Sequence, residues 1–573
     1  MNLTEREKIN IQVSEMKVQR TVFESNWMEI ADYLLPYKLR MNLSDNGRGD
    51  RRNTKIFDST GCKAIETLGA GFMLAVTSPG SAWARLEAEG IDAVEYGPEK
   101  IWLDSTNRKM MKVFDGSNVY GTLNEFYVNF AGFGTAAMSI EETLDGKVIH
   151  SRVYPTGSYW IAQNEYGVVD TFYREFRMTV WQLWKKFGPE GDYSQAVKSM
   201  MDNGQWQEWI DVGHMVSPNV AYDPRSKARG RKQFSSCWYE IGMSSYSGAQ
   251  MAYAAQVENK FLFKSGFDKF PFLVARWNLV EGEVWGIDCP GMTALGDLKS
   301  LQIGERRSWQ FIEKGYNPHF VGPTALKTQG SKGYLPGDTT WIDETQGGAS
   351  LRPLHDINPG WVSPLEQKLT ETRRRIYQDL FYDLFRAFDF IDPAKDITAT
   401  EIMERKNEKL AQLVPMLGQL SRSTLKPLID MTFDIMWKQG MLDEPPSSLA
   451  GKNLSVEFIG VLAQAQRASV ASPVEQLIGM MLPFAQLDPN AVPLFDKIDF
   501  DQAIDEIAHA KGVAATVVRS DEQVAAIREG RAQAMQNAQQ MQAIEQGAKA
   551  AKDLAQAPME GDNALTRLVG AAQ

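Results

Sequence analysis

Two stretches decide the fold, GMTALGDLKSLQIGERRSWQFIEKG over Gly291–Gly315 and LEQKLTETRRRIYQDLFYDL over Leu365–Leu384. In both, apolar residues recur every three or four positions with charged residues between them, which is the pattern of an amphipathic helix. Residues 317–360, between the two, are so rich in glycine and proline that only short strands and turns can form there. This order predicts a hairpin of two long helices with a small module at its tip.

A loop and then a long helix are predicted after the second stretch. The segment Arg386–Pro393 breaks the helical pattern, because proline ends any helix that precedes it. Thr398-Ala-Thr-Glu401 has the form of a capping box, which begins a helix. We expect Pro415 to kink this helix and Gly440 to end it. A chain of this plan suits lining or bracing a larger structure better than enclosing a small substrate.

The composition limits the class of protein. The chain has 573 residues and 43% hydrophobic content, enough for several cores. No apolar run approaches the about eighteen residues that cross a bilayer, and the charged N-terminus lacks the apolar segment of a signal peptide. We therefore expect a protein made and kept in the cytosol, without contact to a membrane. The widely spaced Cys62, Cys237 and Cys289 predict free thiols.

The formal net charge of −11 argues against a broad nucleic-acid-binding surface, which would need a basic patch. It is compatible with nucleic acid sliding past, because acidic walls repel phosphates. The sequence also contains no phosphate-binding Gly-x-x-x-x-Gly-Lys loop, no HExxH pair and no Gly-x-Ser-x-Gly elbow. Asp389, Asp392 and Asp396 lack the spacing of a calcium loop and are interpreted as turn and cap residues. We expect no enzyme activity, no metal and no cofactor.

The N-terminal half predicts a mixed helix-and-strand domain. Gly69-Ala-Gly71 lies inside one of its helices and indicates close packing rather than nucleotide binding. Thr179 is expected to cap a short helix over 180–187. Further helices are expected over 5–35, 61–76 and 98–118, and strands over 147–153, 159–162, 168–176, 233–242 and 257–263. On the first helix we expect the buried side to carry Ile11, Met16, Val18, Val22, Trp27 and Ile30.

After Gly440 the sequence predicts a short strand over 456–461 and then helices only. These helices are expected over 473–484, over 501–511 and from Asp521 onward. The last carries a weak apolar stripe that needs partner helices to be buried. The stripe consists of Val524, Ile527, Met535, Met541 and Ile544.

Four blocks of sequence follow one another in a distinctive order over nearly the whole chain. They are Trp27–Pro36 with Phe57-Asp-Ser-Thr-Gly61, Thr77-Ser-Pro79 and Trp83; Tyr154–Trp160 with Gly167–Arg174; Phe270–Trp277 with Gly282, Gly286 and Leu295-Gly-Asp-Leu298; and Thr398-Ala-Thr-Glu401. Together these blocks resemble the bacteriophage portal family, the head-to-tail connecting proteins of short-tailed phages.

The resemblance implies an α+β, mostly helical fold of the portal type, with a wing, a stem helix pair, a clip, a tunnel loop and a helical crown. The expected boundaries are 1–287 for the N-terminal part of the wing, 288–316 for the first stem helix, 317–360 for the clip, 361–386 for the second stem helix, 387–397 for the tunnel loop, 398–500 for the long kinked wing helix and the return to the wing, and 501–573 for the crown helices with a loosely ordered tail.

The resemblance also implies a function. Family members are structural proteins of the virion, assembled in the host cytoplasm as a ring, usually a dodecamer, at one vertex of the capsid. Double-stranded DNA passes through the ring during packaging and ejection. The implied partners are further copies of the chain, the terminase large subunit, tail adaptor or head completion proteins, and the major capsid and scaffolding proteins.

Two groups of residues are candidates to face the channel. The tunnel loop would present Arg386, Phe388, Asp389, Phe390, Asp392 and Lys395, unless its aromatic residues are buried in the core of an ordinary loop. The charged stem residues are Arg306, Arg307, Glu371, Arg373, Arg374 and Arg375. The three consecutive arginines fan around their helix, so at most one or two can face a channel. For most of them we favour pairing between subunits, with acids such as Glu366 and Asp379.

Two other functions stay open at the level of sequence. A hydrolase or nuclease that uses paired carboxylates would be a monomer or dimer whose activity depends on a single Asp or Glu. Another internal capsid or scaffold protein would be present in many copies per particle rather than as one ring.

Overall fold

The computed structural model describes residues 4–43, 52–80, 82–88, 97–143, 148–226, 228–242, 260–318, 320–323, 339–342, 352–353, 360, 362–385, 414–449, 452, 454–458, 499–510, 517–519 and 521–555. The described residues form both helices and strands, so the predicted mixture is confirmed. The chain divides into two compact units. Unit 1 comprises Met1–Arg85, Thr106–Asp443 and Val456–Gln466, and unit 2 comprises Leu86–Ser105, Glu444–Ser455 and Arg467–Gln573.

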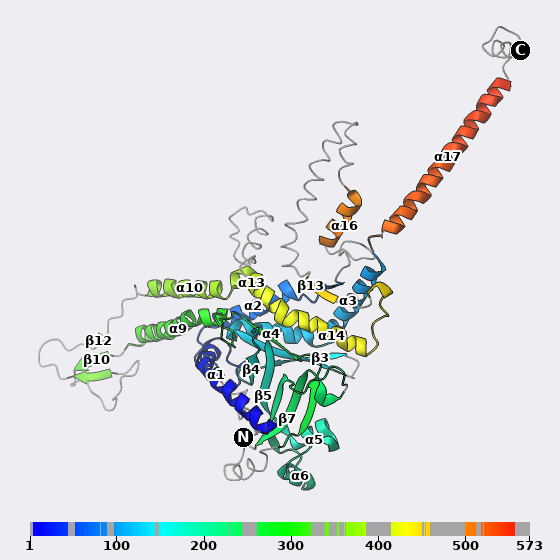
Figure 1. Ribbon diagram of the computed structural model, residues 1–573. Coiled ribbons are helices and arrows are strands. Elements are labelled where there is room, and N and C mark those ends of the chain that lie inside the picture. The colour runs from blue at the N-terminus through cyan, green and yellow to red at the C-terminus, as the bar shows by residue number, and fades with distance from the viewer. Residues whose placement is uncertain are drawn as a thin grey trace. The chain divides into compact units, whose positions relative to one another are not determined.

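Two antiparallel sheets lie in unit 1 (Figure 1). The larger has the order β4-β5-β6-β7-β8, with β4 at Tyr159–Gln163, β5 at Val169–Thr179, β6 at Trp209–Pro218, β7 at Phe234–Gly242 and β8 at Phe263–Phe267. The smaller has the order β3-β2-β9, with β2 at Thr135–Glu142, β3 at Ile149–Tyr154 and β9 at Phe272–Arg276. The predicted β4–β5 hairpin is confirmed, because Trp160 pairs with Tyr173 across it.

The helices of the N-terminal half mostly begin and end where the sequence predicts. Thr179 and Gln182 form a capping box at the start of α5, as expected. The helices are α1 at Glu5–Tyr33, α2 at Thr60–Val76, α3 at Pro98–Gly116, α4 at Val119–Phe133, α5 at Val180–Phe187 and α6 at Gln195–Asp202, with 3₁₀ turns at Gly188–Glu190 and Arg229–Arg231.

The buried face of α1 differs from the expected one. Ile11, Val18 and Val22 are exposed, whereas the buried stripe includes Val13 and Arg20. Arg20 belongs there because its guanidinium donates hydrogen bonds to the carbonyls of Gly157 and Tyr159, at 2.6 and 3.0 Å, and lies over Trp160. A charge whose hydrogen bonds are made can therefore be buried where hydropathy alone predicts an apolar residue. Met16, Trp27 and Ile30 are buried as expected.

The pair α2 and α4 forms the core beside the smaller sheet. The glycines of Gly69-Ala-Gly71 permit this packing. A Cβ at Gly69 would lie 2.4 Å from Val128 Cγ2 on α4, and a Cβ at Gly71 would lie 2.3 Å from the Phe385 ring. The prediction of close packing is thus confirmed.

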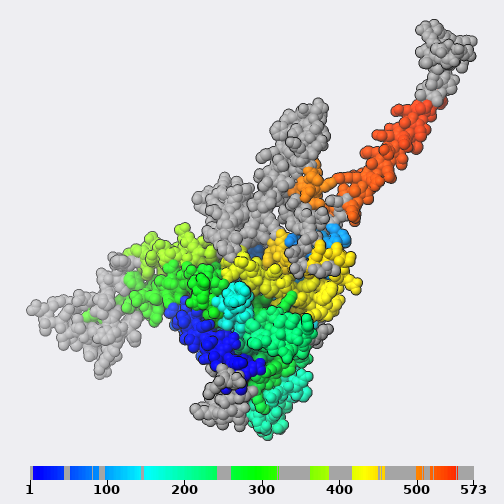
Figure 2. Space-filling view, viewed as in Figure 1, coloured from blue at the N-terminus to red at the C-terminus, as the bar shows by residue number. Residues whose placement is uncertain are grey.

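The two predicted long helices lie side by side and extend from the sheets of unit 1 (Figure 1). The first is α9 (Leu295–Tyr316), preceded by the single turn α8 (Pro290–Thr293). The second is α10 (Val362–Asp379), followed by α11 (Tyr382–Phe385). Figure 2 shows the pair, in green and yellow-green, protruding on the left. The break between α10 and α11 coincides with a positive φ of 51° at Phe381, a conformation that a helix cannot contain.

Short strands occur in the glycine- and proline-rich block, as predicted. The described parts form a three-stranded sheet of order β11-β10-β12, in which β10 pairs parallel with β11 and antiparallel with β12. The strands are β10 at Phe320–Pro323, β11 at Thr339–Ile342 and β12 at Arg352–Pro353.

The long helix after residue 413 is continuous but not uniform. It consists of α13 (Val414–Leu420), one π-helical segment (Ser421–Leu425) and α14 (Lys426–Lys438), and Gly440 follows with a φ of 68°. The predicted end at Gly440 is confirmed. The irregular segment lies after Pro415 and directly before Pro427, whose missing N–H cannot bond the carbonyl of the preceding turn.

Unit 2 is described in fewer segments. It contains the 3₁₀ turn Ser447–Leu449, α16 (Phe500–Ala510) and α17 (Asp521–Ala555). Three elements include residues of both units: β1 (Ala84–Ala88), β13 (Leu454–Phe458) and α3. The expected stripe of α17 is uncovered, since Met535, Met541 and Ile544 are about 70% exposed. Figure 2 shows this helix in red.

The structure also bears on the expected thiols, membrane segments and metal ligands. Cys62, Cys237 and Cys289 are free thiols, as predicted. Among the described helices, none combines the length and the apolar character needed to cross a membrane. No cluster of three or more potential metal ligands occurs in the described ranges. The expected tunnel loop, the Thr398 cap and the helix over 473–484 lie outside the described residues.

Candidate functional site

The helices α9 and α10 pack closely at their base. Leu298 and Leu301 of α9 and Leu369 and Ile376 of α10 are buried. Gly304 brings the two helices together, because a Cβ there would lie 2.6 Å from Leu369 Cδ2. The apolar contact is local: it covers the part of α9 nearest the sheets of unit 1 and leaves the far end of the helix uncovered.

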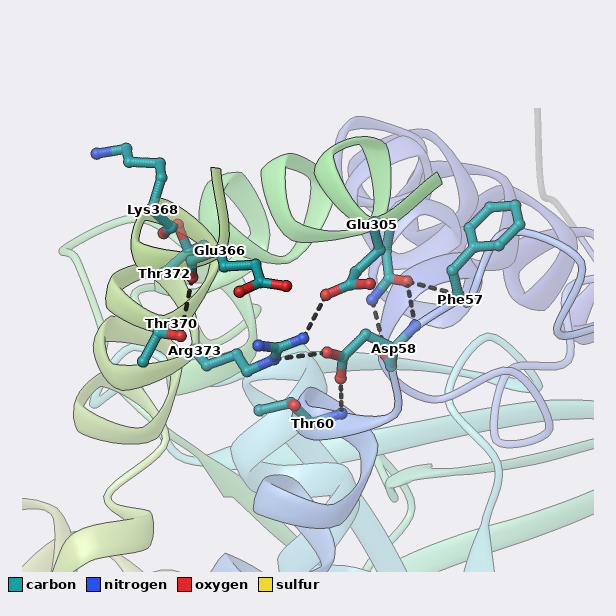
Figure 3. Close-up of polar contacts among 10 residues, drawn as sticks. Phe57, Asp58, Thr60, Glu305, Glu366, Lys368, Thr370, Thr372 and Arg373 are labelled. Atoms are coloured by element: carbon teal, nitrogen blue, oxygen red, sulfur yellow. Dashed lines mark hydrogen bonds and ion pairs between the residues drawn. The ribbon is translucent and has the colours of Figure 1, made fainter. Parts of the chain in front are cut away.

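A polar cluster around Asp58 ties this helix pair to the turn before α2 (Figure 3). Gln302 of α9 accepts hydrogen bonds from the backbone N–H groups of Phe57 and Asp58, at 2.6 and 2.8 Å, and donates to the Asp58 carbonyl. The Asp58 carboxylate accepts from the N–H of Thr60 at 2.7 Å and from Nε of Arg373, on α10, at 2.8 Å. The turn before α2 is therefore hydrogen-bonded to both α9 and α10.

Arg373 bridges three elements. Its second guanidinium nitrogen, Nη2, forms an ion pair with Glu305 of α9. The side chains of Asp58 and Glu305 are mostly buried, at 13% and 15% exposed. Burial alone would raise the pKa of Asp58, but the hydrogen bonds from Thr60 and Arg373 outweigh it and lower the pKa. Asp58 is therefore ionised at neutral pH, and the cluster depends on the charge of Arg373.

Arg375 makes a second connection between the helices. Its guanidinium forms a two-pronged pair with the Asp297 carboxylate, at 2.8 and 2.9 Å, and this hydrogen bonding lowers the pKa of Asp297. Glu371 lies 3.5 Å from Arg375 and 3.3 Å from Lys368, on the exposed side of α10. Arg373 and Arg375 thus form ion pairs within one chain. Their partners are not Glu366 and Asp379, the two acids that the sequence suggested for pairing between subunits.

The remaining stem charges point away from the helix pair. Arg306, Arg307 and Arg374 are exposed. Arg306 lies 5.9 Å from the centre of the Phe57 ring. Within the ranges that the structure describes, none of the three forms an ion pair, and neither does Glu366. Of the three consecutive arginines, Arg374 differs from Arg373 and Arg375 in forming no ion pair within the described residues.

The residues expected in the tunnel loop, Arg386, Phe388, Asp389, Phe390, Asp392 and Lys395, lie outside the described residues. The structure does describe the chain that leads into them. Leu384 is buried, and the ring of Phe385 packs edge-on against Phe72 of α2 and fills the space over Gly71. The segment that begins at Arg386 therefore starts from a fixed point at the base of the helix pair.

Comparison with known proteins places this architecture in a family. The family model described as bacteriophage head to tail connecting protein matches residues 6–518. The chain belongs to this family. It is 39% identical over 569 residues to the portal protein of Salmonella phage epsilon15, with 99% of each chain covered. It is 34% identical over 564 residues to the probable portal protein of Bordetella phage BPP-1, with 98% of each covered. The resemblance noted in the sequence is confirmed.

A solved structure, the virion of a native gene transfer agent particle, is also similar to the chain. The match covers 73% of this chain and 85% of that chain at 7% identity, with a TM-score of 0.31. A TM-score of this size does not establish a shared fold. The family assignment depends on the family model and on the two portal relatives.

Sequence reasoning found the arginines of the second long helix but not their partners on other elements, Asp58, Asp297 and Glu305. Asp58 had been noted only within the block Phe57-Asp-Ser-Thr-Gly61, and Asp297 only within Leu295-Gly-Asp-Leu298. Glu305 and Gln302 lie on the side of α9 that faces the core. The signal that could have identified them is the occurrence of polar residues within an otherwise apolar stripe. A buried polar residue needs a partner from another segment, and Gln302 is only 2% exposed.

We expect the three consecutive arginines to differ sharply in their contribution to stability. Arg373→Ala leaves two mostly buried carboxylates unpaired and should lower the free energy of unfolding by about 2 kcal/mol. This loss is smaller than that for breaking a fully buried ion pair, because the Arg373 side chain is 35% exposed. Arg375→Ala should cost less, and Arg374→Ala should cost nothing measurable. Thermal unfolding of the three variants checks this order, and an equal loss for Arg373→Ala and Arg374→Ala would contradict it.

Proposed function

We propose that copies of this chain stand side by side in a closed ring, and that double-stranded DNA enters and leaves the capsid through the channel of this ring. The portal role itself follows from the family and from the two portal relatives, and it makes the protein a part of the bacteriophage virion. The ring, its symmetry of twelve and the passage of DNA are the proposed additions. In this account the chain is a conduit and carries out no chemistry.

The elements take the following roles in this proposal. The helices α8–α9 and α10–α11 are the stem, within 288–316 and 361–386. The strands β10, β11 and β12 belong to the clip, 317–360, which would dock the terminase large subunit and later the tail adaptors. Residues 387–397 are the tunnel loop and 501–573 the crown. The wing, which would meet capsid and scaffolding proteins, comprises 1–287 and 398–500.

The observation that carries the proposal is the braced α9–α10 pair, in which the outer half of α9 presents exposed apolar side chains. Trp309 and Tyr316 are 67% and 93% exposed, and Ile312 is also exposed. They continue the stripe of Leu298 and Leu301, which is buried nearer the base. An exposed stripe on a rigidly held helix is costly in water and fits contact with the next copy.

Both helices expose charges of both signs, and some of them can pair between copies. The exposed charges of α9 include Arg306 and Arg307, and those of α10 include Glu366, with Lys368 and Arg374 also exposed. If α9 of one copy faces α10 of the next, Glu366 can meet Arg306 or Arg307 without disturbing the pairs that Arg373 and Arg375 make inside each chain. Such pairs set the orientation of neighbours more than they add affinity.

Placing charges in the exposed stripe tests the assembly. The double change Trp309→Glu and Tyr316→Glu should weaken association by more than about tenfold, because carboxylates would be buried between copies. Light scattering after size exclusion should show multiple copies for the native chain and one copy for the variant. Val220→Glu, at a fully exposed loop position, is the matched control and should leave the mass unchanged. Native-like assembly of the double variant would contradict the proposal.

A further inference from the structure

A cavity of about 450 Å³ lies in unit 1, between the two sheets, α5 and α14. Its lining comes from strands of both sheets and includes Arg174 of β5, Lys186 of α5 and His214 of β6. The volume is in the range of small-molecule sites and exceeds what an inorganic ion needs. This cavity is separate from the stem and has no part in the proposed passage of DNA.

Two cations of the lining, the buried Arg174 and the exposed Lys186, form no ion pair among the described residues. Arg174 is 7% exposed, and its Nε has no hydrogen-bond partner. Glu141, on β2, also lines the cavity and is exposed; its charge favours both cations from a distance, without an ion pair to either. A buried guanidinium without an anion is costly, so its presence requires an explanation.

Aromatic rings compensate this charge only in part. The guanidinium carbon of Arg174 lies 4.3 Å from the centre of the Phe176 ring and 5.1 Å from that of Tyr154. The Lys186 ammonium lies 3.9 Å from the centre of the Trp238 ring. These contacts stabilise a cation through the faces of the rings, but they supply no acceptor for its N–H groups.

His214 adds a further unpaired polar atom at the same place. Its ring stacks on Trp238 at 3.9 Å, its Nε2 lies 3.0 Å from Ser236 Oγ, and its Nδ1 is buried without a partner. Burial and the neighbouring Arg174 and Lys186 lower its pKa well below the ordinary value. Burial likewise lowers the pKa of Lys186 to about 8, with Arg174 contributing. Both shifts have the direction expected for groups withdrawn from water beside a cation, and the opposing effect of Glu141 on Lys186 is the smaller one.

Two other lysines of the lining are paired. Lys232 bonds Asp268 at 2.9 Å, and Lys269 bonds Asp434 at 2.5 Å. The lining also includes the exposed Glu141, Glu142 and Lys438. The remaining walls are mostly apolar and come from Phe187, Phe263, Phe267, Phe272, Met431 and Ile435.

We propose that this cavity binds a small organic anion, with its carboxylate or phosphate group against Arg174, Lys186 and His214 and its apolar body along the phenylalanine walls. The anion supplies the acceptor that the Arg174 N–H groups lack. The site is independent of ring formation and would be present in each copy of the chain.

Binding of simple probes to the full-length protein tests the site. Benzoate and phenyl phosphate each carry the two required parts, whereas benzamide lacks the charge and inorganic phosphate lacks the apolar body. At least one of the two anionic probes should raise the temperature of unfolding and bind measurably by calorimetry, and benzamide and phosphate should bind about tenfold more weakly or not at all. Equal binding of benzoate and benzamide, or no binding of either anionic probe, would overturn the proposal.

Variants separate binding from folding. Lys186→Gln should weaken the anionic probe about tenfold, while Lys185→Gln, at the neighbouring position that does not line the cavity, should change nothing. Arg174→Met should abolish probe binding without lowering the unfolding temperature of the unliganded protein, because a buried unpaired charge is removed. Equal effects of the two lysine variants would contradict the site. If the Arg174→Met variant does not fold, the comparison of Lys186→Gln with Lys185→Gln still tests whether the cavity binds the anion.

Discussion

Replacing Gly291 with alanine should lower the free energy of unfolding of unit 1 by about 3 kcal/mol. A Cβ at this position in α8 would lie 2.2 Å from the carbonyl oxygen of Gly132 and 2.9 Å from its carbonyl carbon and Cα. These are backbone atoms at the end of α4, which is buried on all sides, so they cannot move aside as a flexible side chain would. The start of the stem would be forced away from the core.

Gly296→Ala is the matched control for this change. It lies five residues further on, inside α9, and a Cβ there would meet nothing within 4 Å. Since alanine favours the helix over glycine, this variant should gain about 0.5–1 kcal/mol. Chemical denaturation of the two variants measures both values. If both variants change the free energy of unfolding by the same sign and amount, the close contact of Gly291 with Gly132 does not contribute to stability.

Deleting residues 388–395 should abolish retention of packaged DNA while leaving the assembled particle otherwise intact. The reason is geometric: in the proposed ring these residues, with Asp389, Asp392 and Lys395 among them, are the part of each chain nearest the DNA. Their anchor, α11, is fixed independently by Phe385 against Gly71 and Phe72. DNase-protected DNA per particle should fall to roughly one per cent of the native level, a loss of about a hundredfold.

A replacement of the same eight residues by a Gly/Ser linker controls for chain connection. It should assemble as the native chain does and show the same packaging defect as the deletion. If the deletion instead prevents folding of the purified chain, the aromatic residues Phe388 and Phe390 belong to a core and the ordinary-loop interpretation is the correct one.

The elements that sequence reasoning located best are those with one buried and one exposed face. The stripe of Leu365, Leu369, Ile376 and Leu380 located α10, and Thr179 gave the start of α5, because each signal is local. The break at Phe381 between α10 and α11 was not predicted. The helix α4 was missed for the opposite reason. Its second half, from Phe126 to Phe133, is buried on all sides, so it has no polar face to reveal its period.

Long-range polar contacts were the other omission. Whether Arg373 pairs with Asp58 depends on how α2, α9 and α10 pack, and no spacing along the chain encodes that contact. The same holds for the buried face of α1, where Arg20 is accepted because Gly157 and Tyr159 offer carbonyls. Partners more than a hundred residues apart become visible only when the elements are assembled.

Negative-stain electron microscopy of the purified full-length chain tests the central claim most directly. The account predicts closed rings of identical subunits, twelve in the expected form, with an open centre lined by the α9–α10 pairs. Particles that stay single chains in every buffer, or closed assemblies without a central opening, would contradict it.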